Sequence, residues 1–190
     1  MNSLYKEQIK KVVIPKFKKE FSLKNDQEVP GITKVVINTG IGRQMNKAQN
    51  TKELIEKMSQ ELALITGQKP SLRPARKSIA SFKIRTGMPV GLMVTLRGKR
   101  MGDFIYKFVN VVLPRVRDFW GIPLTNIDGQ GNLNYGIKEH LVFPELSKRE
   151  KAFSLGLEIS FVTNTRNKEK SIKLFRLLGF PLKLKESENK

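Results

Sequence analysis

The sequence predicts an α+β fold in which an antiparallel sheet carries helices on one face and leaves a polar opposite face. Three segments alternate apolar and polar residues with the period of two that is typical of half-buried strands. Other segments have apolar residues at helical spacing. Helices interspersed with such strands favour an antiparallel sheet covered on one side, and the chain contains neither internal repeats nor low-complexity tracts.

Four segments are expected to be helical. They are residues 3–21, 47–66, 101–118 and 168–178. In the first helix Pro15 is expected to produce a kink or an early end, because proline removes a backbone donor. Gly67 is placed to end the second helix, and Pro114 interrupts the third. Gly179 and Pro181 are stop signals for the fourth.

Three segments are expected to be strands. They are residues 33–38, 90–97 and 155–161. The apolar face of each strand is expected to join the core, which leaves Asn38, Thr95 and Arg97 on the polar faces of the first two. Residues 128–134 are glycine-rich and are expected to form a turn.

The composition indicates a nucleic-acid partner. The chain has 190 residues, with 36 Lys+Arg, 17 Asp+Glu, one His and no Cys, and its net charge is +19. This length fits one domain or a tightly joined pair. Without cysteine, a disulfide framework, a thiolate metal site and a cysteine nucleophile are excluded, and a reducing cytosol is the expected compartment. The excess of cations predicts a polyanion, with nucleic acid ahead of an acidic membrane surface.

The positive charge is concentrated in residues 62–102, which contain nine Lys/Arg and no acid. Ordinary solvated surfaces mix both signs, so this segment favours contact with a polyanion. Within it, residues 73–85 are expected to form a long exposed loop that contacts phosphates. The loop carries the cations Arg73, Arg76, Lys77, Lys83 and Arg85.

The polar strand faces lie beside this basic segment in the predicted fold. Asn38, Thr95 and Arg97 therefore suit a platform for a phosphate backbone. The alternative is an ordinary solvated sheet face, and the residue pattern alone leaves both interpretations open.

Motifs for catalysis and cofactor binding fail in detail. After Gly40 and Gly42, the third glycine of a dinucleotide fingerprint is replaced by Met45. Gly98 and the lysine after it lack the remaining residues of a phosphate-binding loop. His140, the only histidine, cannot supply a multi-histidine metal site and is expected to be structural or on the surface. The sequence therefore predicts no enzyme, no cofactor and no metal.

Membrane insertion and secretion are poor interpretations. The longest stretch without a charged residue, residues 86–96, has eleven residues, whereas a spanning helix needs about 20 apolar ones. The N-terminal residues alternate charged and apolar side chains and contain no signal-peptide core.

Five stretches carry motifs that occur together, in this order and at suitable spacings, in one known family. They are KVVINTGIG (34–42), LITGQKP (64–70), ARKSIASFKIRTGMPVGLMVTLRG (75–98), LPRVRDFWG (113–121) and KEHLVFPE (138–145). The chain thus resembles the bacterial large-subunit ribosomal proteins called L five, which bind 5S rRNA. The resemblance covers about residues 5–181 and implies a single α+β domain over residues 1–181, with a charged tail at 182–190.

The resemblance also implies where RNA is bound. The family attaches 5S rRNA to the large-subunit rRNA in the central protuberance and has no catalytic activity or cofactor. Its RNA-contacting sheet positions correspond to Asn38, Gln68 and Thr95, with basic help from Lys69 and Arg97. The polar face of the sheet is therefore expected to be the RNA-binding face.

Two further contacts are implied by the resemblance. The basic loop 73–85 is similar to the family loop that approaches peptidyl-site tRNA, and residues 138–152 are similar to the part that bridges to a small-subunit protein. The match is weaker where helix 47–66 is about one turn longer than usual, and where Trp120 stands in place of a basic residue.

The leading hypothesis is therefore a cytoplasmic, ribosome-bound structural protein of the large subunit. A DNA-binding architectural or regulatory protein is the alternative from another class, although no clear helix-turn-helix or zinc finger supports it.

Overall fold

The chain forms a five-stranded sheet with helices, and the predicted antiparallel α+β class is confirmed. The computed structural model describes residues 4–45, 50–146 and 154–183. The strands, in sheet order, are β2 (Ser71–Pro74), β3 (Pro89–Leu96), β1 (Ile32–Gly40), β5 (Leu157–Thr163) and β4 (Leu133–Ile137). The α-helices are α1 (Leu4–Gln8), α2 (Ile14–Phe21), α3 (Gly42–Met45), α4 (Thr51–Thr66), α5 (Gly98–Lys107) and α6 (Lys168–Leu177).

Internal packing divides the chain into two compact units. Unit 1 lies within residues 1–35, 97–135 and 160–190, and unit 2 lies within residues 36–96 and 136–159. Most of the predicted RNA-contacting residues fall in unit 2.

The strands of unit 2 have one fully buried face, as their alternation predicts. Ile37 of β1, the even-numbered residues of β3 from Leu92 to Leu96, and Ile159 of β5 have essentially no solvent exposure. The residues between them on β1 and β3 are half-buried, and they are Val36, Asn38, Gly91, Met93 and Thr95. One face therefore forms the core of the unit and the other stays accessible.

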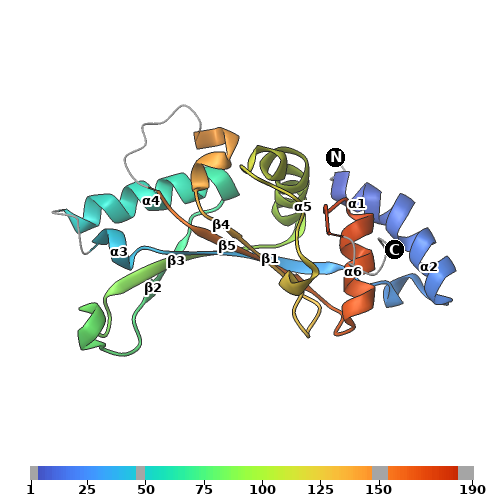
Figure 1. Cartoon of the computed structure of the whole chain (residues 1–190), viewed down its shortest axis with the longest axis horizontal. Helices are drawn as coiled ribbons and strands as arrows, with labels where there is room; N and C mark the ends of the chain where they lie inside the picture. Colours follow the sequence, from blue (N-terminus) through green and yellow to red (C-terminus); the bar gives the residue numbers. More distant parts are fainter. Residues whose placement is uncertain (1–3, 46–49, 147–153, 184–190) are drawn as a thin grey trace. The chain divides into compact units, whose positions relative to one another are not determined.

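Helix α4 lies along one side of the strands of unit 2 (Figure 1) and packs against β3. Its buried residues include Met58, Leu62 and Ile65, which lie on the predicted apolar stripe. Gly67 ends the helix in the left-handed conformation (φ 67°), as expected. The predicted start at residue 47 is wrong, because Asn50 has non-helical backbone angles and its side chain accepts the Glu53 N–H as an N-cap. Residues 47–49 lie outside the described part of the chain.

The N-terminal helix of unit 1 continues past Pro15 to the end of α2. A π-helical turn over Ile9–Val13 joins α1 to α2, and Pro15 stands in the first turn of α2. Because proline cannot donate a backbone hydrogen bond, the helix accommodates it through this local change of helix type rather than by ending. Residue 3 of the predicted helix lies outside the described range.

The third helix begins and ends earlier than predicted. α5 starts at Gly98, continues as a π-helical segment over Phe108–Val112, and closes as a 3-10 turn over Leu113–Arg115. Residues 116–118 are not helical, because the Val116 backbone is extended (φ −69°, ψ 126°) and its N–H closes the 3-10 turn on the Leu113 carbonyl (3.2 Å). The fourth helix, α6, agrees with its prediction to within one residue.

Two strands were not predicted. β2 pairs antiparallel with β3 in the register Leu72↔Leu92 and Arg73↔Gly91, so the segment 73–85 is not wholly an irregular loop. β4 begins at Leu133, within the predicted turn. Arg97, predicted as the last residue of a strand, lies one residue beyond β3.

Candidate nucleic-acid interface

The accessible face of the unit 2 sheet carries the first group of predicted RNA contacts. Asn38 on β1 and Thr95 on β3 are both half-buried and stand on the face opposite the core. β1 and β3 are neighbours in the sheet, and the Ile41 N–H donates to the Val90 carbonyl (3.0 Å) where they meet. The structure therefore places Asn38 and Thr95 on one face of adjacent strands, with a rigid core beneath them.

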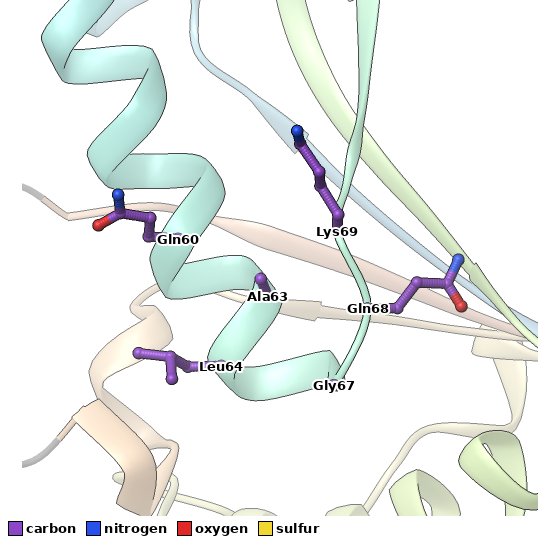
Figure 2. A pocket seen from close by; sticks show the side chains of 6 residues that line it. All are labelled: Gln60, Ala63, Leu64, Gly67, Gln68 and Lys69. Atoms are coloured by element: carbon purple, nitrogen blue, oxygen red, sulfur yellow. The ribbon is translucent and has the colours of Figure 1, made fainter.

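Gln68 is held beside β3 by the end of α4. After Gly67 turns the chain, the Gln68 N–H donates to the Thr66 hydroxyl (3.3 Å), which itself donates to the Leu62 carbonyl (2.7 Å). The side chain of Gln68 points away from α4 (Figure 2), and its Nε2 donates to the Thr95 carbonyl (3.4 Å). Gln68 and Thr95 are thus brought together.

The two basic residues predicted beside these positions differ in their placement. Lys69 is exposed, directly follows Gln68 in unit 2, and lines the open pocket beside the end of α4 (Figure 2). Arg97 is exposed, but it belongs to unit 1, where its extended backbone (φ −140°, ψ 165°) forms the N-cap position of α5.

Arg73 joins the sheet face, which the sequence did not indicate. It stands on β2 opposite Gly91, and its guanidinium Nη2 lies 3.6 Å from Sδ of Met93, a residue of the accessible face. A Cβ at position 91 would lie 3.1 Å from the Thr39 carbonyl oxygen, so a side chain there would crowd the neighbouring strand β1. Arg73 therefore adds a cation beside the sheet rather than at the end of the loop.

The remaining four loop cations are exposed on a hairpin that extends β2 and β3. They are Arg76, Lys77, Lys83 and Arg85. Ile79 and Ile84 exchange backbone hydrogen bonds (2.9 and 3.1 Å), and the Ser78 hydroxyl accepts the Thr86 N–H (2.9 Å). A 3-10 turn over Ala80–Phe82 closes the end, which projects away from α4 (Figure 1). Local backbone bonding therefore shapes the hairpin.

Exposed apolar side chains stand among these cations. Phe82 is 65% exposed and Ile79 is 45% exposed. No role was predicted for these two residues from the sequence. Aromatic faces stack on nucleobases, so the end of the hairpin combines two chemistries that suit RNA.

An open pocket of about 540 Å³ lies between the end of α4 and the segment that follows it. It is lined by Gln60, Ala63, Leu64, Gly67, Gln68 and Lys69 (Figure 2). It shares Gln68 and Lys69 with the predicted RNA-contacting residues, so it lies at one margin of the predicted interface.

His140 is a structural residue of unit 2. It is 1% exposed, its Nδ1 accepts the Leu155 N–H (3.2 Å), and its Nε2 lies 2.7 Å from a carboxylate oxygen of Glu61 on α4. Because Nδ1 accepts, Nε2 carries the proton and donates to Glu61. The pair ties α4 to the segment after β4.

Among the described residues, no group of three or more His, Cys, Asp or Glu is arranged to hold a metal ion. Over the same residues, no helix is both long enough and apolar enough to cross a membrane.

Comparison with known proteins decides the family. Residues 25–85 match the model of the ribosomal protein L5 family, and residues 89–182 match the model of that family's C-terminus. The chain belongs to the ribosomal protein L5 family. It is 48% identical over 178 residues to the large ribosomal subunit protein uL5 of Thermotoga sp. (strain RQ2), covering 94% of this chain and 95% of that protein. The uL5 of Halothermothrix orenii is 45% identical over 181 residues, covering 94% and 98%.

Membership of the ribosomal protein L5 family confirms the predicted resemblance and makes the chain a structural ribosomal protein rather than an enzyme. The DNA-binding alternative gains nothing from these matches. The individual RNA, tRNA and bridge contacts stay predictions.

Proposed function

We propose that this protein is a constituent of the large ribosomal subunit that binds 5S rRNA and helps attach it to large-subunit rRNA in the central protuberance. Its place is then on cytoplasmic ribosomes. The observation that carries the proposal is the sheet of unit 2 in a chain of this family, because that sheet has one face in the core and a polar, accessible face beside exposed cations.

The accessible face recognises the RNA backbone. The Asn38 amide and the Thr95 hydroxyl are short polar groups on rigid strands, so they suit hydrogen bonds to sugar and phosphate oxygens. Gln68 offers its remaining amide groups beside Thr95. Arg73 and Lys69 neutralise phosphates at the margin, and Arg97 adds charge from the start of α5.

The hairpin contacts peptidyl-site tRNA. Its exposed cations Arg76, Lys77, Lys83 and Arg85 stand at a distance from the buried face of the sheet, in a segment shaped by local hydrogen bonds. Such a projecting element can reach a second RNA without disturbing the first contact.

Residues 138–152 contribute to a bridge with a small-subunit ribosomal protein. In the described part, exposed Lys138 and Glu139 precede buried His140 and Phe143. The buried residues fix the segment, and the exposed charges are available to a partner. Residues 147–152 lie outside the described range.

The 5S rRNA assignment is tested by Asn38→Ala combined with Thr95→Ala. Loss of two side-chain hydrogen bonds, each contributing about 0.5–1.5 kcal/mol, predicts an affinity for 5S rRNA that is about 5- to 150-fold weaker. The dependence of log affinity on log salt is unchanged, because no cation is removed.

The matched control is Asn25→Ala combined with Thr33→Ala, which removes the same residue types from exposed positions of unit 1. It is expected to keep the affinity within about twofold, a change below about 0.5 kcal/mol. Equal affinities for the wild type and the Asn38/Thr95 variant would defeat the assignment of this face.

A further inference from the structure

A single aromatic residue of unit 1 stands almost entirely in solvent. Trp120, the one tryptophan of the chain, is 83% exposed, more than any other exposed large hydrophobic residue that the structure describes. It lies in the turn that follows the 3-10 segment Leu113–Arg115, far in sequence from the sheet positions that bind 5S rRNA in the proposed function. Scattered apolar side chains are common on protein surfaces, so exposure alone assigns nothing.

The backbone around Trp120 is held in a fixed shape. Asp118 adopts the left-handed conformation (φ 53°), and Gly121 also has a positive φ (92°). A Cβ at position 121 would lie 3.1 Å from the Pro181 carbonyl oxygen, so only glycine fits there without displacement. Directly afterwards, the Ile122 N–H donates to that carbonyl (2.8 Å), and the Lys183 N–H donates to the Ile122 carbonyl (2.9 Å).

The neighbouring aromatic residue anchors the same turn from within. Phe119 meets the ring of Tyr135 edge-on, with the centroids 6.4 Å apart. Tyr135 in turn meets the buried ring of Phe108 at 5.9 Å. Of two consecutive aromatic residues, one is therefore fixed in the aromatic cluster while Trp120 is presented to solvent. Because the backbone that carries Trp120 is already held, binding through its ring needs little further ordering of the chain.

Charge near Trp120 favours an anionic partner. Arg115 ends the 3-10 segment and Arg117 lies in the turn that follows it; both are exposed, and within the described ranges neither forms a salt bridge. Lys183 is a third cation close to this turn. Its Cγ lies so near Gly121 that a Cβ at position 121 would be only 3.3 Å from it. Asp118 is the one acid of this turn. An exposed aromatic ring with exposed arginines close to it in sequence combines base stacking with phosphate neutralisation, whereas a hydrophobic protein partner would leave these cations without a counter-charge.

We propose that Trp120 stacks on an unpaired nucleobase of ribosomal RNA, while Arg115 and Arg117 neutralise the phosphates that flank it. This inference rests on the proposed function, in that the ligand is rRNA, but it uses a surface of unit 1 and not the sheet face of unit 2. It gives the protein a second RNA contact with its own chemistry.

The test uses the fluorescence of the single tryptophan. The full-length protein is titrated separately with 5S rRNA and with protein-free large-subunit rRNA, and both the emission and the access of iodide to the ring are followed. Stacking on a base is expected to quench the emission and to protect Trp120 from iodide. Quenching by either RNA supports the proposal, and the RNA that produces it contains the base.

Three variants separate stacking from a structural role. Trp120→Ala is expected to weaken binding of the quenching RNA about 5- to 150-fold, the range for loss of one base–aromatic stack. Trp120→Phe keeps an aromatic face and is expected to retain most of the affinity. Tyr106→Ala removes another exposed aromatic ring of unit 1 (46% exposed) and is expected to change nothing.

Two results would overturn the inference. One is unaltered Trp120 emission with both RNAs in a protein that binds 5S rRNA normally, which would leave the proposed function intact. The other is a Trp120→Ala variant that binds the quenching RNA as tightly as the wild type, which would show that the ring does not stack on a base. If the wild type fails to bind 5S rRNA, the proposed function fails, and quenching by large-subunit rRNA still supports the stacking contact.

Discussion

The sheet face and the hairpin of unit 2 present their proposed RNA contacts in two different ways. On the sheet face, Asn38 and Thr95 are half-buried side chains of strands whose reverse faces are completely buried. On the hairpin, the cations and Phe82 are exposed, and the segment is shaped mainly by bonds such as those between Ile79 and Ile84. The buried core therefore holds the sheet face in place, whereas local backbone hydrogen bonds hold the hairpin.

This difference matches two kinds of recognition. Short amides and hydroxyls on a rigid surface can bind only an RNA whose shape places oxygens opposite them, so they favour one fixed partner. Long cationic side chains on a projecting hairpin act over a distance and tolerate movement of the partner. A permanent contact with 5S rRNA and a transient contact with tRNA therefore suit the two regions, respectively.

The largest expected effect concerns the stability of the two regions. Leu92→Ala empties a fully buried position of β3, and we expect it to lower the free energy of unfolding by about 2–5 kcal/mol. Its register partner on β2, Leu72, is 50% exposed, so Leu72→Ala should cost about 0.5 kcal/mol or less. Urea denaturation of both variants measures the contrast, and equal losses would show that the hairpin strand is as deeply anchored as β3.

A smaller loss of stability is expected when the contact between His140 and Glu61 in unit 2 is broken. Glu61→Leu leaves the Nε2–H of buried His140 without the carboxylate that it meets at 2.7 Å, which should cost about 1–3 kcal/mol. Glu56→Leu, on the exposed side of the same helix, is the control and should change stability by about 0.5 kcal/mol or less. Thermal unfolding followed by circular dichroism compares the two variants. If the Glu61 variant is as stable as its control, the contact between His140 and Glu61 does not stabilise unit 2.

The smallest effect is expected for single contacts of the hairpin. Arg76→Ala with Lys77→Ala removes two exposed cations, so the slope of log affinity for tRNA against log salt should fall by about 1.4–1.8. Affinity for 5S rRNA should stay unchanged. Filter binding at several salt concentrations measures both, and the reverse pattern would exchange the roles of the hairpin and the sheet face.

The long strands and helices could be predicted because each has a clear period. β1, β3 and β5 bury every second residue over most of their length, as their alternation predicts, and α4 and α6 end just before glycines. Helix boundaries that depend on a capping residue or on a local change of helix type were not predicted correctly. Asn50 caps α4 later than expected, and a π-helical turn before Pro15 lets the N-terminal helix continue.

Features that depend on pairing could not be predicted. β2 has four exposed residues and includes Pro74, so nothing in its own pattern indicates a strand, and only its bonds to β3 make it one. The position of Arg73 beside Met93 follows from that pairing. The sequence likewise cannot say which of two adjacent aromatic residues is anchored, and packing against Tyr135 selects Phe119 and leaves Trp120 outside.

The most direct test of the account is an experimental structure of the full-length protein bound to 5S rRNA. We expect sugar or phosphate oxygens within about 3.2 Å of the Asn38 amide and the Thr95 hydroxyl, which is hydrogen-bonding distance. Arg76 and Lys77 should make no contact with this RNA. A complex in which 5S rRNA lies on the hairpin and leaves the sheet face uncovered would contradict the account.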